Sequence, residues 1–309
     1  MTLQADRDAL VELNLNAGRK AKVSAAYEMA FEYLKMGLGL LDPHSWRDQY
    51  ELALELHNEA TEIACLSGHF EQMEHLVETV IQNASTVQDK VAVYQFRVLG
   101  YWAQNKLSEA LGAALEILQM LGMKFTKELT LADMRRSVNQ TQSVVGRKTA
   151  EELLNLPQMR DPVNLAILRI IKDAAFCAYS TRYELFVQLL LAGINLIQRN
   201  GNTSLAPFFY CFYGSVLCGV ADDIESGYKY GQLGLDLLQR LNAREIMCRT
   251  LFAFNVYIRH FKEHVKETFK PLADGYQAGL ETGDLSYAAY CALSYCVRMY
   301  MASTNLVEV

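Results

Sequence analysis

The sequence has 309 residues, 51% of them hydrophobic, and a formal net charge of −6. Neither half carries a net positive charge, which argues against nucleic-acid binding through neutralised phosphates. No run of about 18 residues is free of charged or strongly polar side chains, so membrane insertion is not expected. Seven cysteines without a Cys-x-x-Cys pair favour reduced thiols, and we expect a cytoplasmic protein.

Taken in chain order, a short apolar pattern recurs along the whole sequence at intervals of 36 to 43 residues. The positions that anchor it are Ala30, Met73, Ala110, Ala150, Phe186, Gly227 and Thr268. Around these anchors, the positions at −3, 0, +4 and +7 are mostly apolar or small, and these offsets share one face of a helix. Periods of roughly 34 to 47 residues typify stacked helix pairs. We therefore predict an all-α solenoid of about seven helix pairs, without a β-sheet.

The corners between paired helices carry residues that end one helix and begin the next. Gly68 predicts a helix end that is followed at once by a new helix. Asn105 and Asp223 stand where a side chain can cap the first backbone N–H groups of the second helix. Gly201 predicts a further helix end.

The fourth repeat is the weakest, over residues 123–162. Arg147 occupies the corner position that is usually apolar, Pro157 occupies the +7 position, and Pro162 follows closely. We interpret residues 1–309 as one helical repeat domain with a degenerate repeat, or a joint between two stacks, near 123–162. An ordinary irregular helix pair is the alternative interpretation.

Two groups of segments carry a resemblance to known families. Residues 27–41 and 68–80 resemble tetratricopeptide repeats of the long kind, with about 40 residues per repeat. Residues 6–22 resemble the segment that follows the ATPase module in very large bacterial, especially cyanobacterial-type, signalling kinases. That likeness continues through residues 66–74 and 103–106.

The resemblance to these kinases implies a place within a larger protein. In them a serine/threonine kinase-like domain and an ATPase precede the helical region, and sensor domains and a histidine kinase often follow it. The chain is then expected to be a non-enzymatic module for protein interaction and signal coupling. Its partners would be proteins or peptides, including other domains of the same polypeptide. The alternative is a small-molecule sensor, as in the solenoids of ATPase-linked regulators.

The sequence contains one nominal match to a catalytic motif. The sequence has no G-x-x-x-x-G-K-[ST] loop and no protein-kinase signature. His260, Glu263 and His264 have the H-x-x-E-H spacing of inverted zinc peptidases. The repeat register places them at a corner between helices, where two ligands four residues apart cannot share a metal. We therefore expect no catalysis, no metal and no cofactor, although a zinc enzyme is the third class considered.

Candidate ligand-binding residues follow from the tetratricopeptide register. The first helices of the first three pairs should face a groove that holds peptides. Trp102 is the strongest single candidate, because tryptophan is enriched among residues that dominate binding energy, although a buried core role is equally compatible with its position. The groove candidates are Arg19, Lys22, Asn58, Glu62, Gln95 and Trp102.

The last helix should be apolar on nearly all sides. Over residues 284–302 the only charged side chain after Asp284 is Arg298. A helix that is apolar on nearly all sides is normally buried, and solenoids normally end in a repeat with a polar outer face. We expect a homodimer through this helix, with Tyr290, Tyr295, Tyr300 and Met301 as the self-association candidates.

Overall fold

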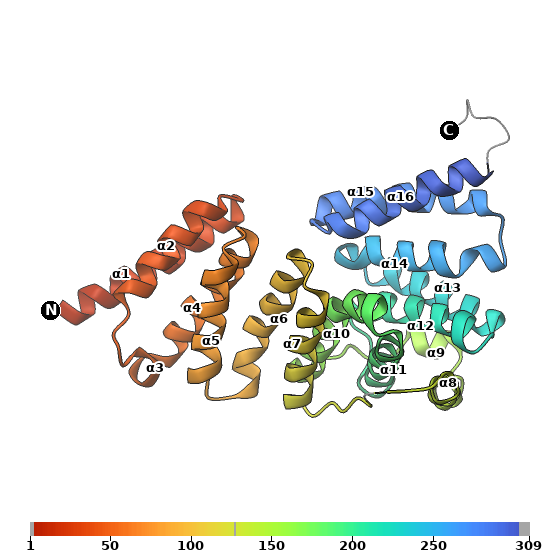
Figure 1. The fold of residues 1–309 in the computed structure, drawn as a ribbon, viewed down its shortest axis with the longest axis horizontal. Helices are drawn as coiled ribbons and strands as arrows, with labels where there is room; N and C mark the ends of the chain where they lie inside the picture. Colours follow the sequence, from red (N-terminus) through yellow and green to blue (C-terminus); the bar gives the residue numbers. More distant parts are fainter. Residues whose placement is uncertain (1–2, 127, 303–309) are drawn as a thin grey trace. The chain divides into compact units, whose positions relative to one another are not determined.

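In the computed structural model, residues 3–126 and 128–302 are described. Within these ranges the regular structure is helical, apart from one isolated β-bridge between Gln158 and Asn202 (Figure 1). The prediction of an all-helical fold is therefore confirmed for the described residues. The chain divides into two compact units, each of which is described by itself below.

The first unit comprises residues 1–124 together with 176–181. Its helices are α1 (Leu3–Val23), α2 (Tyr27–Leu40), α3 (Ser45–Asp48), α4 (Tyr50–Leu66), α5 (Phe70–Asn83), α6 (Val87–Ala103) and α7 (Leu107–Met120). Three helix pairs can be followed in Figure 1: α1 packs on α2, α4 on α5 and α6 on α7. Helix α4 contacts both α2 and α6, so each of these pairs packs against the next one along the chain.

The second unit comprises residues 125–175 and 182–309, described as far as 302. Its helices are α8 (Leu131–Val145), α9 (Ala150–Leu154), α10 (Pro162–Thr181, whose last turn groups with the first unit), α11 (Tyr183–Asn200), α12 (Ala206–Val220), α13 (Ile224–Arg240), α14 (Arg244–Tyr257), the 3₁₀ turns η1 (Arg259–Phe261) and η2 (Val265–Thr268), α15 (Phe269–Thr282) and α16 (Leu285–Ala302). Almost every side chain of α12 is buried, since α8, α11, α13 and α14 all pack on it.

The helix starts reproduce the predicted register in five repeats. The second helix of each pair begins three residues before the anchor. These first residues are Tyr27, Phe70, Leu107, Tyr183 and Ile224. Two repeats differ. Ala150 is itself the first residue of the short helix α9, and Thr268 ends the 3₁₀ turn that precedes α15. Thr149 provides the reason at α9, because it forms a capping box with Glu152 and so fixes the helix start.

Four of the corners between helices share one backbone conformation. The residue two positions before the next helix adopts a left-handed conformation, as at Ala25 (φ 54°), Gly68 (φ 77°), Asn105 (φ 57°) and Asn242 (φ 47°). At each of these corners the following residue donates its N–H to the carbonyl five positions earlier, as from His69 to Ala64 at 2.8 Å. This pattern is the Schellman motif, which satisfies carbonyls at the helix end.

The capping predictions have mixed outcomes. Gly68 ends α4 as predicted, and Asp223 caps α13 by accepting a hydrogen bond from the Ser226 N–H. The prediction for Asn105 is wrong, because this residue takes the left-handed position and the N-cap of α7 is Lys106, whose side chain makes no cap bond. Gly201 ends α11 at φ 105°, as predicted.

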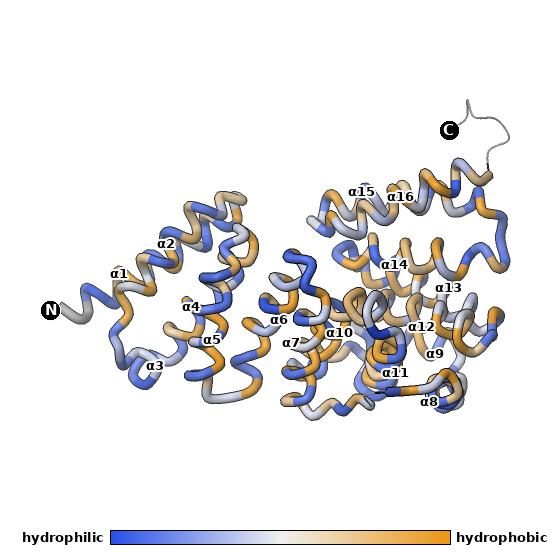
Figure 2. Tube along the Cα trace, in the orientation of Figure 1, coloured by the Kyte–Doolittle hydropathy of each residue, from blue (hydrophilic) through white to orange (hydrophobic). Residues whose placement is uncertain are grey.

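The apolar face of each helix supplies the core of its own unit. In the first unit the anchors Ala30 and Met73 and the flanking residues Leu34 and Val77 are fully or almost fully buried. Figure 2 shows apolar and polar residues alternating along these helices, as expected of helices with one buried face. No helix in the described part of the chain is long and apolar enough to cross a membrane.

Candidate functional site

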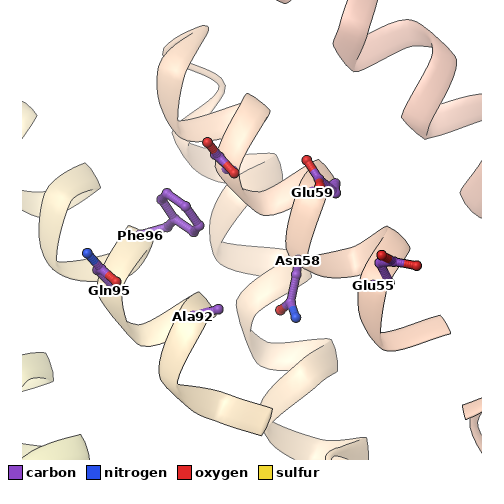
Figure 3. A pocket seen from close by; sticks show the side chains of 7 residues that line it. Glu55, Asn58, Glu59, Ala92, Gln95 and Phe96 are labelled. Carbon is purple, nitrogen blue, oxygen red and sulfur yellow. The ribbon is translucent and has the colours of Figure 1, made fainter. Parts of the chain in front are cut away.

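A pocket of about 360 Å³ opens on the first unit, between α4 and α6 (Figure 3). Its lining residues recur at intervals of three and four, because one face of each helix is presented to the pocket. The lining residues are Glu55, Asn58, Glu59 and Glu62 from α4, and Ala92, Gln95 and Phe96 from α6. Both helices are the first members of their pairs. The groove candidates were predicted on these first helices.

Two cations from α1 hold the carboxylates of the pocket. Lys22 donates from Nζ to Glu62 at 2.6 Å and to Glu59 at 3.0 Å. Arg19 donates from Nε to Glu59 at 2.9 Å and from Nη2 to Glu55. The three carboxylates of α4 therefore face two cations, which leaves the lining with one more negative than positive charge.

The ionic network controls the charge of its central carboxylate. Burial alone would raise the pKa of Glu59, but hydrogen bonds from Arg19 and Lys22 outweigh it and hold the pKa below its usual value. Burial likewise opposes the charged form of Lys22, and its hydrogen bonds to Glu62 and Glu59 raise the pKa of the ammonium group. Both groups stay charged at neutral pH.

Asn58 supplies an acceptor that the described residues do not use. Its side-chain oxygen is inaccessible to solvent and has no hydrogen-bond partner within the described part of the chain. A buried polar atom without a partner is costly, and a bound group that donates a hydrogen bond would relieve that cost. The Phe96 ring and the Ala92 methyl add apolar surface, so the pocket combines acceptors with an apolar wall.

The structure brings together five of the six groove candidates. Asn58, Glu62 and Gln95 line the pocket, and Arg19 and Lys22 bind its carboxylates from α1. Trp102 lies farther along α6 and does not line the pocket. It is half-buried, and its ring packs on Phe176 of the same unit with centroids 6.0 Å apart.

Four of the lining residues were not predicted from the sequence. Glu55 and Glu59 lie three positions before and one after Asn58, and Ala92 and Phe96 bracket Gln95 in the same way. Helical spacing around each candidate could have indicated them. The ion pairs between α1 and α4 have no such signal, because they depend on which helices become neighbours.

The H-x-x-E-H segment does not lie on a continuous helix. His260 belongs to η1, whereas His264 precedes η2 and accepts a hydrogen bond from the Lys266 N–H at 3.2 Å. Glu263 accepts hydrogen bonds from Tyr228 and Arg259, so its carboxylate is already engaged. Across the described ranges, no three potential metal ligands from His, Cys, Asp and Glu gather at one place.

The four self-association candidates divide into two kinds. Tyr290 and Tyr295 are half-buried, because Tyr290 packs on Phe252 and Tyr295 packs on Phe269. Tyr300 and Met301 are 63% and 77% exposed. Two of the four candidates therefore contact neighbouring helices of the same chain. The number of aromatic residues in the helix is thus larger than the number whose rings are exposed.

Comparison with known proteins gives one informative likeness. No protein-family model matches the sequence. The chain is similar to hybrid signal transduction histidine kinase G of Dictyostelium discoideum, with 19% identity over 333 aligned residues. The alignment covers 99% of this chain and 10% of that protein, so the chain spans about a tenth of the length of its relative.

Proposed function

We propose that this chain is a non-enzymatic interaction module of a large signalling kinase, which couples other domains by binding a protein segment. Its helix pairs stack as a tetratricopeptide-like solenoid, and the first unit binds a peptide in the α4–α6 pocket. The partner is another protein or another domain of the same polypeptide.

The likeness to a histidine kinase supports the signalling context. It covers almost the whole of this chain but a small part of the relative. A helical segment within a very long kinase is a natural position for an interaction module. The five helix starts in repeat register, and the recurrent left-handed corners, support the solenoid.

The pocket is the observation that carries the proposal. Asn58 offers a buried acceptor without a partner, and the carboxylates beside it exceed the cations by one. A peptide has backbone N–H groups that can donate to Asn58. A lysine or arginine side chain would also be attracted to Glu55, which is the most exposed of these carboxylates. We expect bound peptides to be enriched in basic residues.

A random peptide library displayed on phage tests this proposal. The library is selected on the wild-type protein and then depleted on an Asn58→Ala, Gln95→Ala variant. Peptides that remain after both steps should bind the wild type with micromolar affinity. Their affinity for the double variant should be lower by about tenfold or more. Titration calorimetry measures both affinities.

A matched control uses Gln82→Ala, an exposed glutamine on α5 that lies outside the pocket. Its affinity for the same peptides should equal that of the wild type. The proposal fails if no peptide is enriched, or if the enriched peptides bind the pocket variant and the wild type equally well.

A small-molecule sensor is the second candidate, because about 360 Å³ lies at the lower end of the range of small-ligand sites. Differential scanning fluorimetry with a panel of amino acids, nucleotides and sugars distinguishes the two. A compound that raises the melting temperature of the wild type, but not of Asn58→Ala, would favour the sensor.

A further inference from the structure

Arg19 of α1 bridges two carboxylates of the α4–α6 pocket. It donates from Nε to Glu59 at 2.9 Å and from Nη2 to Glu55. The two glutamates lie four positions apart on α4, so one turn of the helix presents both carboxylates to a single guanidinium. The chain's own arginine therefore illustrates how this edge of the pocket binds a guanidinium group.

The contact at Glu55 is the exposed half of this bridge. The side chains of Arg19 and Glu55 are 36% and 50% exposed, whereas that of Glu59 is 17% exposed. Ion pairs between exposed side chains contribute little to stability, because water screens them and two long side chains must be held in one geometry. A competing cation can therefore replace Arg19 more easily at Glu55 than at Glu59.

The packing of α1 allows this exchange. Helix α1 packs mainly on α2 and contacts α4 much less. Gly18, beside Arg19, lies so close to Leu34 of α2 that an added Cβ would meet the Leu34 side chain at 2.7 Å. Val11 and Leu15 supply the buried apolar side chains of α1. Because α1 is held by this apolar face, release of Glu55 by Arg19 would leave the helix in place.

The pocket around Glu55 suits a long cationic side chain. Glu55 lines the pocket together with the Ala92 methyl and the Phe96 ring of α6 (Figure 3). An arginine has an aliphatic stem that can lie against such apolar groups. Its flat guanidinium pairs with a carboxylate and can stack on an aromatic ring. The groups at this edge of the pocket therefore match an arginine side chain.

We propose that Arg19 masks Glu55, and that an arginine of a bound peptide takes its place at this carboxylate. The proposal rests on the function proposed above, in which the pocket binds a peptide. The number of ion pairs is conserved, because Arg19 retains Glu59 while the incoming guanidinium binds Glu55. Arg19 thus limits the affinity of the pocket for arginine, and any change that draws its side chain away from Glu55 strengthens binding.

A pentapeptide with one central arginine, acetyl-Ala-Ala-Arg-Ala-Ala-amide, tests the proposal on the whole chain. Saturation-transfer difference NMR at low salt measures its dissociation constant. The same peptide with citrulline, which has the shape of arginine without the charge, is measured beside it. Arg19→Met should bind the arginine peptide about three- to tenfold more tightly than the wild type, because the competing cation is gone. Binding of the citrulline peptide should not increase.

Lys20→Met is the matched control. Lys20 is exposed on α1, next to Arg19, and takes no part in the ion pairs between α1 and α4 described above. The substitution changes the net charge by the same amount, so the variant should bind the arginine peptide like the wild type. Equal gains in affinity for Lys20→Met and Arg19→Met would overturn the proposal, because net charge alone would then explain both. Circular dichroism checks that each variant is folded.

A double-mutant cycle locates the gain at Glu55. Glu55→Gln alone should weaken binding of the arginine peptide about three- to tenfold, and in this background Arg19→Met should lose most of its gain. The proposal is overturned if Arg19→Met leaves the affinity unchanged, if its gain persists in full without the Glu55 carboxylate, or if neither the wild type nor Arg19→Met binds the arginine peptide. Peptides without arginine that bind through Asn58 and Gln95 would still support the function proposed above, so the two proposals can fail separately.

Discussion

Arg249 of α14 donates from Nε to Oδ2 of Asp284 at 2.6 Å, and the two side chains are only 7% and 13% exposed. The Arg249 guanidinium also lies over the Tyr287 ring, 4.6 Å from its centroid. Because Asp284 immediately precedes α16, this buried pair ties the start of the last helix to α14.

Arg249→Leu should destabilise the protein by about 3 kcal/mol, because it leaves the buried carboxylate of Asp284 without its cation. Urea unfolding of wild type and variant gives the difference. Adding Asp284→Asn should recover part of the loss, since the uncompensated charge is then removed. Equal stability of the wild type and the single variant would show that the pair contributes nothing.

Ala25→Gly should stabilise the first unit by about 0.5 to 1 kcal/mol. Ala25 adopts a left-handed conformation with φ 54°, which costs a residue with a Cβ roughly 1 to 2 kcal/mol, and glycine avoids most of that cost. Gly68 already occupies the equivalent corner with φ 77°. Thermal unfolding should show a higher melting temperature for the variant. A lower one would mean that the loss of chain entropy outweighs the relief of strain.

Glu59→Gln should destabilise the protein by about 0.5 to 1 kcal/mol at neutral pH, because it removes the negative charge and one of the two acceptor oxygens that bind Arg19 and Lys22. The folded-state pKa of Glu59 lies below the ordinary value of 4.5. The stabilisation is therefore complete above pH 4.5 and is lost as the pH falls through the folded-state pKa. Unfolding curves of both proteins across this range should converge on the acidic side. A constant difference at all pH values would exclude this origin.

Iodoacetamide should modify Cys296 well before the other cysteines of the native protein. Cys296 is exposed, whereas Cys248 and Cys291 are buried with their Sγ atoms 3.9 Å apart. Burial raises the pKa of both Cys65 and Cys218 to about 11, so little reactive thiolate forms at pH 8. Peptide mass spectrometry over time gives the order of labelling. Modification of Cys65 as fast as Cys296 would contradict the packing of α4 on α6.

The repeat register was predictable because it depends on local spacing. An apolar residue three positions before Ala30, Met73 and Ala110 starts a helix in each case, as it does in two later repeats. The corner conformation was harder to predict. Ala25 gives no signal of a left-handed backbone. Asparagine is favoured both as an N-cap and in the left-handed position of a helix end, and Asn105 takes the left-handed position, one residue before the N-cap Lys106.

The candidate site was predictable only in part. The register identified Asn58, Glu62 and Gln95 as residues of one helical face, and the structure gathers them at one pocket. It could not show that Arg19 and Lys22 are engaged by carboxylates of α4, because that pairing depends on tertiary contact. For the same reason the residue types of α16 did not separate the half-buried Tyr290 from the exposed Tyr300.

The left-handed corners have a consequence for the order in which the chain folds. At Ala25, Gly68, Asn105 and Asn242 they are closed by hydrogen bonds that reach back no more than five residues, as from Lys106 to Tyr101 at 2.8 Å. A hairpin of two helices can therefore form from contacts close in sequence, before the neighbouring hairpins exist. Proteins dominated by such short-range contacts fold quickly, because little loop entropy is lost before contacts are gained. Stopped-flow refolding should accordingly begin with a fast helical phase.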